Sequence, residues 1–200
     1  VIVRSPVEHV YSQYLHCLGK PLRHFPRNDT GFATWLAHFA ALAPAQTGPD
    51  YDYNCIDPRN LVTRHLSCDA APNPKANHAL WPPPDLARAL STIREVDWLG
   101  LTDLYSTSLC VLKFRLNGAL PVGCDCDDGE EAQHVHWDWG VRPHGRQDLD
   151  KTIIASIYRL TDLDAQIFAK ALDRFYHDVR VAEAFAKRPI LCVAHLRTWL

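Results

Sequence analysis

The chain has 200 residues, of which 47% are hydrophobic, and its formal net charge is −2 at pH 7. This apolar content predicts one globular domain with a sizeable core, and the near-neutral charge excludes the basic footprint expected of a nucleic-acid-binding protein. Because the sequence has no run of about eighteen apolar residues, no segment of it is expected to span a bilayer.

Seven cysteines and no methionine occur in the sequence. Such cysteine content favours an oxidising compartment. Cys55 and Cys68 bracket a predicted loop and are the best candidates for a disulfide, whereas Cys110 is predicted to be an ordinary core residue. The lack of methionine and a start within a predicted core strand indicate that the sequence is a fragment of a longer protein.

The first predicted elements are a strand and a helix. Residues 1–3 are β-branched and apolar, which is typical of a strand buried on both faces. A helix follows, because Ser5 suits the N-cap, Pro6 suits the first helical position and Glu8 completes a capping box. Its predicted inward residues recur at helical spacing: Val7, Val10, Tyr11, Tyr14 and Leu15.

Arg4 lies where the strand passes into the helix, and Ser12 lies about two turns beyond Ser5 on the same helical face. In open α/β sheets ligands bind at the carboxyl ends of strands, where an arginine and a hydroxyl group can hold a phosphate. A structural interpretation is also open, in which Arg4 makes a salt bridge at the strand end and Ser12 is solvated.

Arg4, Pro6, Glu8, Tyr11 and Ser12, in this order, resemble the 3′-phosphate-binding motif of the sulfotransferases. The residue after Arg4 is a serine where the family more often has an aspartate, and serine caps a helix equally well. In the family the arginine and the serine bind the 3′-phosphate of 3′-phosphoadenosine 5′-phosphosulfate (PAPS), the sulfuryl donor. The resemblance implies the same role for Arg4 and Ser12.

Residues 32–42 follow as a predicted packing helix with Trp35, Leu36, Phe39 and Leu42 on one stripe. A loop rich in proline and glycine over residues 43–53 separates this helix from the next segment.

Residues 54–66 resemble a segment of the heparan sulfate and related carbohydrate sulfotransferases, in which asparagine is followed by Gln-Thr-Arg-x-Leu. Thr63, Arg64 and Leu66 match, and Val62 replaces the glutamine. The resemblance implies that Thr63 and Arg64 are further cofactor-binding residues. A surface or ion-pairing arginine on a short helix would explain Arg64 as well.

Residues 85–118 predict a helix, a strand and a second helix. Leu86, Leu90 and Ile93 are the predicted inward residues of the first helix, and residues 96–101 form the strand. Thr102 is the predicted cap of the second helix, which Asn117-Gly118 ends. Its predicted inward residues are Leu104, Tyr105, Leu109, Leu112 and Leu116. The segment around Trp98 and Gly100 resembles the family's aromatic-x-Gly-hydrophobic-Thr-Glu element, which bears on the fold and carries no catalytic role.

Residues 121–146 crowd cysteine, histidine and acidic side chains. His136 and Asp138, with the distant His195, could form the facial triad of a non-haem iron oxygenase, or the metal site of a hydrolase. An acidic, solvated loop is the preferred interpretation, because the surrounding chain lacks the alternating strands that hold such a triad. Residues 141–144 resemble a Val-x-Pro-His element that precedes the last helices of the sulfotransferases.

Residues 149–188 are predicted to be helical, with a break at Thr161 and Asp162. Residues 160–175 resemble the C-terminal end of carbohydrate sulfotransferase domains, so the resemblance covers most of residues 1–175 as several short motifs in family order. One face of the first helix carries Ile153, Ile154, Ile157 and Leu160. One face of the second carries Leu163, Ile167, Ala171, Leu172 and Phe175.

The resemblance implies a partial sulfotransferase domain over residues 1–200 with an α/β fold, a P-loop NTPase-like parallel sheet flanked by helices and lacking its first strand–loop–helix. It implies PAPS as co-substrate, no bound metal, and sulfuryl transfer to a hydroxyl group, expected to be that of a carbohydrate or glycan. The catalytic base and the 5′-phosphosulfate loop are expected before residue 1. Catalytic residues are therefore unassigned, and the fragment is predicted to be inactive.

The resemblance also implies a lumenal domain of a Golgi membrane protein, with a membrane anchor outside these residues. A non-catalytic helical interaction domain is a further interpretation of the same sequence.

Overall fold

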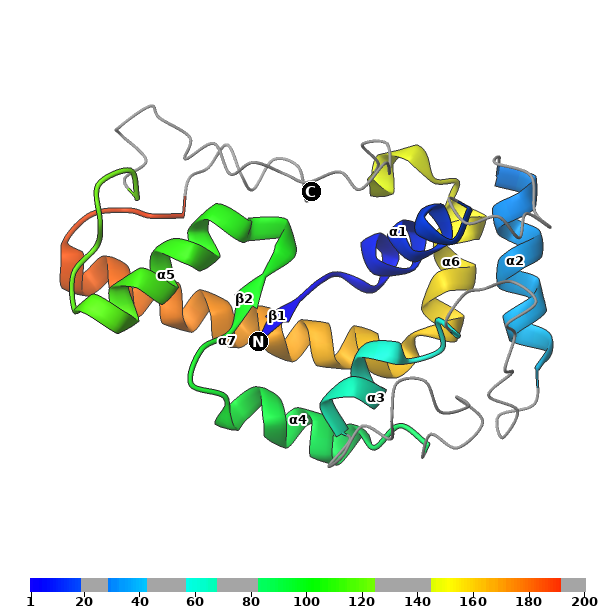
Figure 1. The fold of residues 1–200 in the computed structure, drawn as a ribbon, viewed down its shortest axis with the longest axis horizontal. Helices are drawn as coiled ribbons and strands as arrows, with labels where there is room; N and C mark the ends of the chain where they lie inside the picture. The colour runs from blue at the N-terminus through cyan, green and yellow to red at the C-terminus, as the bar shows by residue number, and fades with distance from the viewer. Residues whose placement is uncertain (19–28, 43–56, 68–82, 125–144, 192–200) are drawn as a thin grey trace. The chain divides into compact units, whose positions relative to one another are not determined.

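The structure is a computed structural model that describes residues 1–18, 29–42, 57–67, 83–124 and 145–191 (Figure 1). Two short strands and two 3-10 helices occur among these residues: β1 (Ile2–Val3), β2 (Gly100–Leu101), η2 (Thr102–Leu104) and η3 (Arg146–Asp148). The remaining elements are α1 (Pro6–Leu18), α2 (Asp29–Ala41), α3 (Leu61–Ser67), α4 (Leu86–Glu95), α5 (Tyr105–Asn117), α6 (Lys151–Leu160) and α7 (Asp162–Ala186).

The predicted α/β fold with a P-loop-like sheet is wrong for the described residues, which are mostly helical. Their sheet consists of β1 and β2 alone, paired in parallel with Ile2 opposite Gly100 and Val3 opposite Leu101. The predicted strand over residues 96–101 is shorter because arginine side chains, rather than another strand, bind the carbonyls of Val96 and Asp97. β1 is not buried on both faces either, since Ile2 is 45% exposed.

The chain divides into two compact units. The first unit comprises residues 1–4, 93–137 and 169–200, and the second comprises residues 5–92 and 138–168. α4 and α7 each contribute residues to both units.

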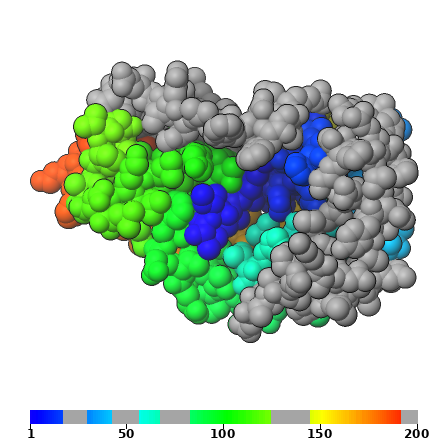
Figure 2. Space-filling model, in the orientation of Figure 1, coloured from blue at the N-terminus to red at the C-terminus, as the bar shows by residue number. Residues whose placement is uncertain are grey.

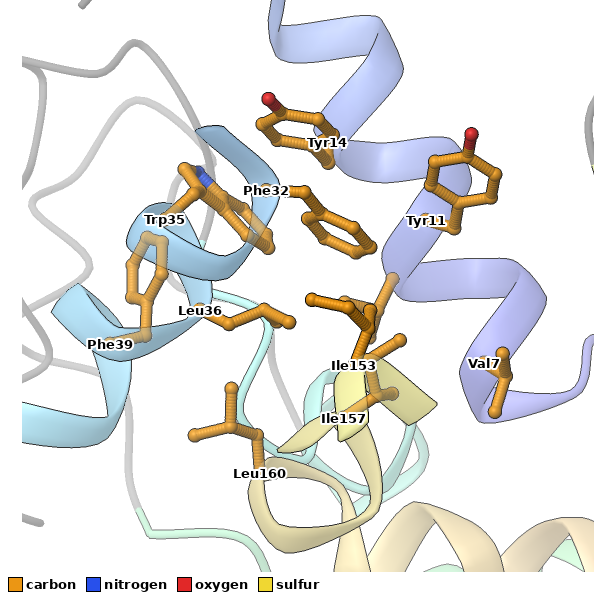
Figure 3. Packing of buried hydrophobic residues seen from close by; sticks show 11 residues of the cluster. Val7, Tyr11, Tyr14, Phe32, Trp35, Leu36, Phe39, Ile153, Ile157 and Leu160 are labelled. Carbon is orange, nitrogen blue, oxygen red and sulfur yellow. The ribbon is translucent and has the colours of Figure 1, made fainter. Parts of the chain in front are cut away.

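The core of the second unit is built from α1, α2 and α6, as Figure 3 shows. Five aromatic residues are packed in it, with Tyr14 stacked on Phe32 at a centroid distance of 4.5 Å and Trp35 meeting Phe39 edge-on at 4.9 Å. The predicted inward residues of all three helices are confirmed as buried or partly buried. The core residues are Val7, Val10, Tyr11, Tyr14, Phe32, Trp35, Leu36, Phe39, Ile153, Ile157 and Leu160.

Side chains cap two helix starts of the second unit, of which the Ser5 cap of α1 is the one predicted. Ser5 Oγ accepts a hydrogen bond from Glu8 N at 3.4 Å, and Asp150 Oδ1 accepts one from Thr152 N at 2.7 Å. Each bond satisfies a backbone donor that the first helical turn leaves unpaired. The carboxylate of Glu8 accepts a further bond from Arg146 N at 2.5 Å, which links α1 to η3.

The predicted inward face of α5 is wrong in part. Leu104 is buried as predicted, and Leu109 and Leu112 are half-buried, but Tyr105 and Leu116 are exposed. Thr107, Ser108 and Val111 are buried, whereas Leu116 is 74% exposed. α5 begins only at Tyr105, after the three residues of η2. A 3-10 helix winds more tightly than an α-helix, so the side chains that follow are rotated away from the face that an α-helix starting at Thr102 would bury.

Two residues hold the turn between β2 and α5 in place. Ser108 Oγ accepts a bond from Leu101 N at 2.8 Å and lies 2.8 Å from Leu104 O. A Cβ atom on Gly100 would lie 2.8 Å from the Trp98 ring, so the close packing of this ring requires glycine. Because the Ser108 bonds satisfy the backbone inside the turn, β2 can pass into a helix without exposing polar groups to the core.

Cys110 is not an ordinary core residue, because it forms a disulfide with Cys124. The bond joins α5 to residues that follow its end. The predicted end of α5 is confirmed, since Gly118 has a φ of 69° and its N–H donates to Phe114 O at 2.8 Å. Glycine adopts this left-handed conformation without strain.

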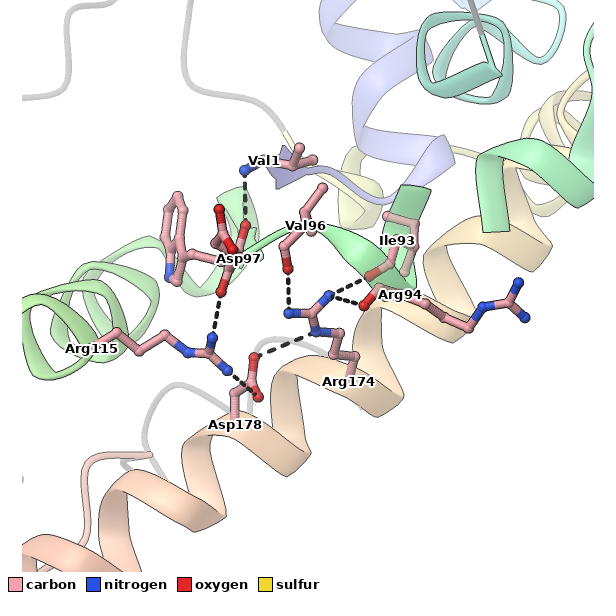
Figure 4. Close-up of polar contacts among 9 residues, drawn as sticks. Val1, Ile93, Arg94, Val96, Asp97, Arg115, Arg174 and Asp178 are labelled. Atoms are coloured by element: carbon pink, nitrogen blue, oxygen red, sulfur yellow. Dashed lines mark hydrogen bonds and ion pairs between the residues drawn. The ribbon is translucent and has the colours of Figure 1, made fainter. Parts of the chain in front are cut away.

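A network of charged side chains organises the rest of the first unit (Figure 4). Arg174 of α7 donates to Ile93 O at 2.5 Å and to Val96 O at 2.6 Å, and thereby binds the end of α4. The buried Asp178 accepts from Arg115 Nη2 at 2.9 Å and lies 3.7 Å from Arg174 Nε. Arg115 also donates to Asp97 O. Polar contacts therefore position the chain that leads into β2.

Candidate functional site

Arg4 directly follows β1, at the carboxyl end of this strand of the first unit. The parallel pairing of Val3 with Leu101 puts the carboxyl ends of β1 and β2 at one edge, so that Arg4 and Thr102 follow the two strands there. The Val1 carbonyl accepts a bond from Gly100 N at 2.8 Å, which fixes this register. Arg4 is half-buried and Thr102 is exposed. A guanidinium at such an edge can make paired hydrogen bonds to a phosphate.

Ser12 lies on α1 in the second unit, where it is half-buried beside a core-facing row of side chains. Arg4 is the last residue of the first unit in this part of the chain, and Ser5 begins the second. Arg4 and Ser12, the two residues predicted to hold the phosphate, therefore belong to different units. Their joint action on one phosphate stays a prediction.

Thr63 and Arg64 lie on α3, and both are buried. The backbone N–H of Thr63 donates to Asp164 Oδ1 at 2.8 Å, and its hydroxyl donates to the same oxygen at 2.7 Å. Val62 N donates to Asp164 Oδ2 at 3.2 Å. The carboxylate of Asp164 therefore accepts hydrogen bonds from backbone N–H groups at the start of α3, which have no partner within the helix. The Thr63 hydroxyl donates its hydrogen to the same carboxylate.

Burial raises the pKa of the Asp164 carboxyl above its ordinary value. The hydrogen bonds from Thr63 and Val62 and the charge of Arg64 oppose this increase. Desolvation disfavours the charged form of a carboxyl group, whereas donors and a nearby cation favour it. Asp164 is thus a buried acid whose ionised form depends on the contacts with α3.

Asn60, which immediately precedes α3, makes corresponding contacts with the start of α7. Asn60 Oδ1 accepts from Leu163 N at 3.0 Å and from Asp164 N at 3.3 Å, at the start of α7. Asn60 Nδ2 donates to Asp162 Oδ1 at 3.0 Å. Its backbone is left-handed, with a φ of 48°, a conformation that asparagine tolerates better than most residues. Asn60 therefore caps α7 while Asp164 caps α3, and we call this pair the reciprocal cap.

Sequence reasoning missed the reciprocal cap. Residues 54–66 and 160–175 resembled sulfotransferase segments separately, and nothing in either stretch indicates that they meet. The residue types indicate only that helices start there, because Asn60 immediately precedes α3 and Asp164 lies in the first turn of α7. Asparagine and aspartate are common at helix starts, but in this chain each caps the other's helix.

Arg64 is buried rather than at the surface, and its Nε donates to Arg59 O at 3.2 Å. Arg59 itself is bound by the buried Asp57, with an Nη2–Oδ2 distance of 2.7 Å, and donates to Leu42 O at 3.0 Å. Burial of a guanidinium is costly unless anions or hydrogen-bond acceptors satisfy it. A role of Arg64 in binding an anionic cofactor stays a prediction.

Several predicted residues lie outside the described part of the chain. They include the proposed metal ligands His136, Asp138 and His195, residues 141–144, and the candidate disulfide pair Cys55 and Cys68. Within the described ranges, no group of three or more histidine, cysteine, aspartate or glutamate side chains could hold a metal ion. None of the helices described is both long and apolar enough to cross a bilayer.

Comparison of the chain with protein-family models, curated protein sequences and solved structures gives no match. The functional argument therefore depends on the motif that contains Arg4 and on the position of that motif in the fold.

Proposed function

We propose that the protein is a sulfotransferase that binds the 3′-phosphate of PAPS through Arg4. The supporting observation is the position of Arg4, which directly follows β1 at the carboxyl edge of a parallel strand pair and precedes a helix capped by Ser5. The sequence predicts this order of strand, arginine and capped helix for the residues of the Arg-x-Pro-x-Glu motif. A phosphate at a strand end receives a charge-assisted, bidentate contact from the arginine fork.

Ser12 is the second proposed contact to the 3′-phosphate. It is half-buried on α1 and is not one of the residues of the aromatic core of the second unit. A hydroxyl group donates one hydrogen bond and is weaker than a guanidinium as a phosphate ligand. Arg4 is therefore proposed to supply most of the binding energy, and Ser12 to supply selectivity.

Thr63 receives a positioning role in this proposal. Its hydroxyl is buried and donates to Asp164, so replacing that contact by one to the cofactor would leave the carboxylate short of a donor. Arg64, the next residue on α3, is the proposed cofactor contact of this segment. The reciprocal cap would then fix the orientation of α3 and hence of the Arg64 side chain.

In the proposed reaction, a hydroxyl oxygen of a carbohydrate acceptor bonds to the sulfur of PAPS while the bond between that sulfur and the 5′-phosphate oxygen breaks. A general base takes the hydroxyl proton, and adenosine 3′,5′-bisphosphate leaves. Arg4 would contribute by holding the donor in line for this displacement. No residue of the described chain is assigned as the base.

The test is calorimetric titration of the protein with adenosine 3′,5′-bisphosphate. Arg4→Ala is expected to weaken binding by roughly 1.5–3 kcal/mol, as for the loss of a hydrogen bond to a charged group. Arg180→Ala is the matched control, because Arg180 is an exposed arginine of the same unit. An unchanged dissociation constant in Arg4→Ala, or no binding by the unmodified protein, would contradict the proposal.

A non-catalytic helical interaction domain is the second candidate, and the helical content of the described residues favours it. Such a domain has no reason to bind a nucleotide. The same titration therefore distinguishes the two candidates.

A further inference from the structure

Thr102 is the counterpart of Arg4 at the carboxyl edge of the strand pair in the first unit. Val3 is paired with Leu101, so Arg4 and Thr102 are the first residues beyond the paired positions of β1 and β2. Neighbouring strands lie about 5 Å apart, and the two backbones leave the edge at about this separation. In Figure 2 the blue surface of the first residues adjoins the green surface of the segment that contains β2. Arg4 and Thr102 belong to the same unit.

The strand pair has one buried face and one more open face. Val3 and Leu101 are buried, whereas Ile2 is 45% exposed. Successive side chains of a strand point to opposite faces, and Leu101 is extended, with a φ of −117° and a ψ of 130°. Thr102 therefore points away from the buried face, to the side on which Ile2 lies. By the same alternation Arg4, which follows Val3, is on that side too.

The Thr102 hydroxyl is available to a ligand. Thr102 is exposed, and within the described part of the chain its hydroxyl makes no hydrogen bond. Two neighbouring hydroxyl groups are less available, because Ser108 Oγ is bound to the backbone of the turn and Thr107 is only 2% exposed. Thr102 therefore presents its hydroxyl to solvent at the edge where Arg4 lies.

Arg4 and Thr102 together provide the donors that a phosphate monoester needs. Such a group has three terminal oxygens, of which the fork of an arginine binds two. The third can accept a hydrogen bond from a hydroxyl group, which threonine carries on a short, stiff side chain. Ser12, the other residue proposed to contact the phosphate, lies in the second unit. The edge therefore contains a guanidinium and a hydroxyl group within one unit.

Acidic residues occur near this edge in the sequence. Asp103 follows Thr102 and is already engaged in a contact of its own. Residues 125–131, which lie outside the described part of the chain, contain five acidic residues. Because the charge of these neighbours does not favour an anion, selectivity for a phosphate at this edge has to come from directed hydrogen bonds.

We propose that Thr102 donates a hydrogen bond to the 3′-phosphate that Arg4 binds, and that it selects the bisphosphate over nucleotides that lack this phosphate. The inference rests on the proposed function and adds a specificity-determining residue to its cofactor site. Thr102 contacts the 3′-phosphate alone, so it contributes nothing to binding of the adenosine and 5′-phosphate groups. The segment around Trp98 and Gly100 thus leads into a binding residue as well as into a helix.

The experiment is calorimetric titration of the protein with adenosine 3′,5′-bisphosphate and with adenosine 5′-monophosphate. Thr102→Val removes the hydroxyl and keeps the shape of the side chain. It is expected to weaken binding of the bisphosphate about tenfold, as for the loss of one hydrogen bond to a charged group, and to leave binding of the monophosphate unchanged. Thr102→Ser keeps the hydroxyl and is expected to retain the preference for the bisphosphate.

The matched control is Thr34→Val, which removes an exposed threonine hydroxyl from α2 in the second unit and is expected to change neither affinity. Circular dichroism melts establish that each variant is folded. No binding of the bisphosphate by the unmodified protein would overturn the proposed function and this inference with it.

Two other outcomes would overturn the role of Thr102 alone. One is weaker binding of the bisphosphate by Arg4→Ala together with unchanged binding by Thr102→Val, because the phosphate would then be bound without this hydroxyl. The other is an equal loss of affinity for both nucleotides in Thr102→Val, which would assign Thr102 a structural role.

Discussion

The two units are stabilised by different physical means. The second unit has an aromatic core in which Tyr14, Phe32 and Trp35 pack between α1, α2 and α6. In the first unit, Arg174 donates to backbone carbonyls and pairs with Asp178, and Ser108 closes the turn after β2. An aromatic core thus characterises one unit, whereas in the other buried apolar residues such as Val111 and Phe175 are accompanied by polar side chains that fix the backbone.

The largest effect is expected from the aromatic core. Phe39→Ala removes a fully buried ring that contacts Trp35, and should lower the free energy of unfolding by about 3–5 kcal/mol through lost burial and the resulting cavity. Thermal melts of the purified variant measure this loss. A decrease as small as that of an exposed control such as Tyr158→Ala would mean that the core contributes little.

A smaller but substantial effect is expected from the network of the first unit. Asp178→Asn removes the carboxylate that pairs with Arg115 and Arg174, and should destabilise the protein by roughly 1–3 kcal/mol. Arg115 is partly exposed, so water compensates part of the loss. Chemical denaturation quantifies it, with Asp173→Asn as a control on the exposed side of α7. Equal stability of the two variants would show that the network is dispensable.

The difference between the units also explains which features could be predicted. The inward residues of α1, α2 and α6 follow from sequence because burial repeats with the period of a helix. Arg174 binds carbonyls about eighty residues away in sequence. Every residue has a backbone carbonyl, so the sequence does not indicate which carbonyls an arginine will bind. The same holds for η2, whose tighter winding rotates α5 so that Thr107 and Ser108 are buried while the predicted inward residues Tyr105 and Leu116 are exposed.

The candidate site, like the fold, could be predicted only in part. The position of Arg4 at a strand end follows from the β-branched run and the Ser5 cap that flank it. The reciprocal cap does not follow, because Asn60 and Asp164 are separated by 104 positions and meet only in the folded chain. Tertiary contacts of this kind need the fold before they can be recognised.

The smallest expected effect is the pH dependence that Asp164 gives the second unit. Because burial raises its pKa in the folded state, the folded protein holds this proton more tightly than the unfolded chain does. The contribution of Asp164 to stability is therefore greatest at low pH and is lost as the pH rises from the ordinary aspartate value through the raised one.

Urea denaturation across this pH window, with Asp164→Asn for comparison, measures the effect. The stability of the unmodified protein relative to Asp164→Asn should decrease as the pH rises. An increase over the same window would mean that the hydrogen bonds from Thr63 and Val62 outweigh burial. Both proteins share every other titrating group, so the difference isolates Asp164.

The central claim, that Arg4 binds the 3′-phosphate of the sulfuryl donor, is tested most directly by comparing two ligands. Adenosine 3′,5′-bisphosphate and adenosine 5′-monophosphate differ only in that phosphate, and calorimetry gives the affinity ratio of the two for the unmodified protein and for Arg4→Ala. We expect the unmodified protein to prefer the bisphosphate by at least about tenfold and the variant to lose most of this preference. An equal ratio in both proteins would contradict the assignment of Arg4.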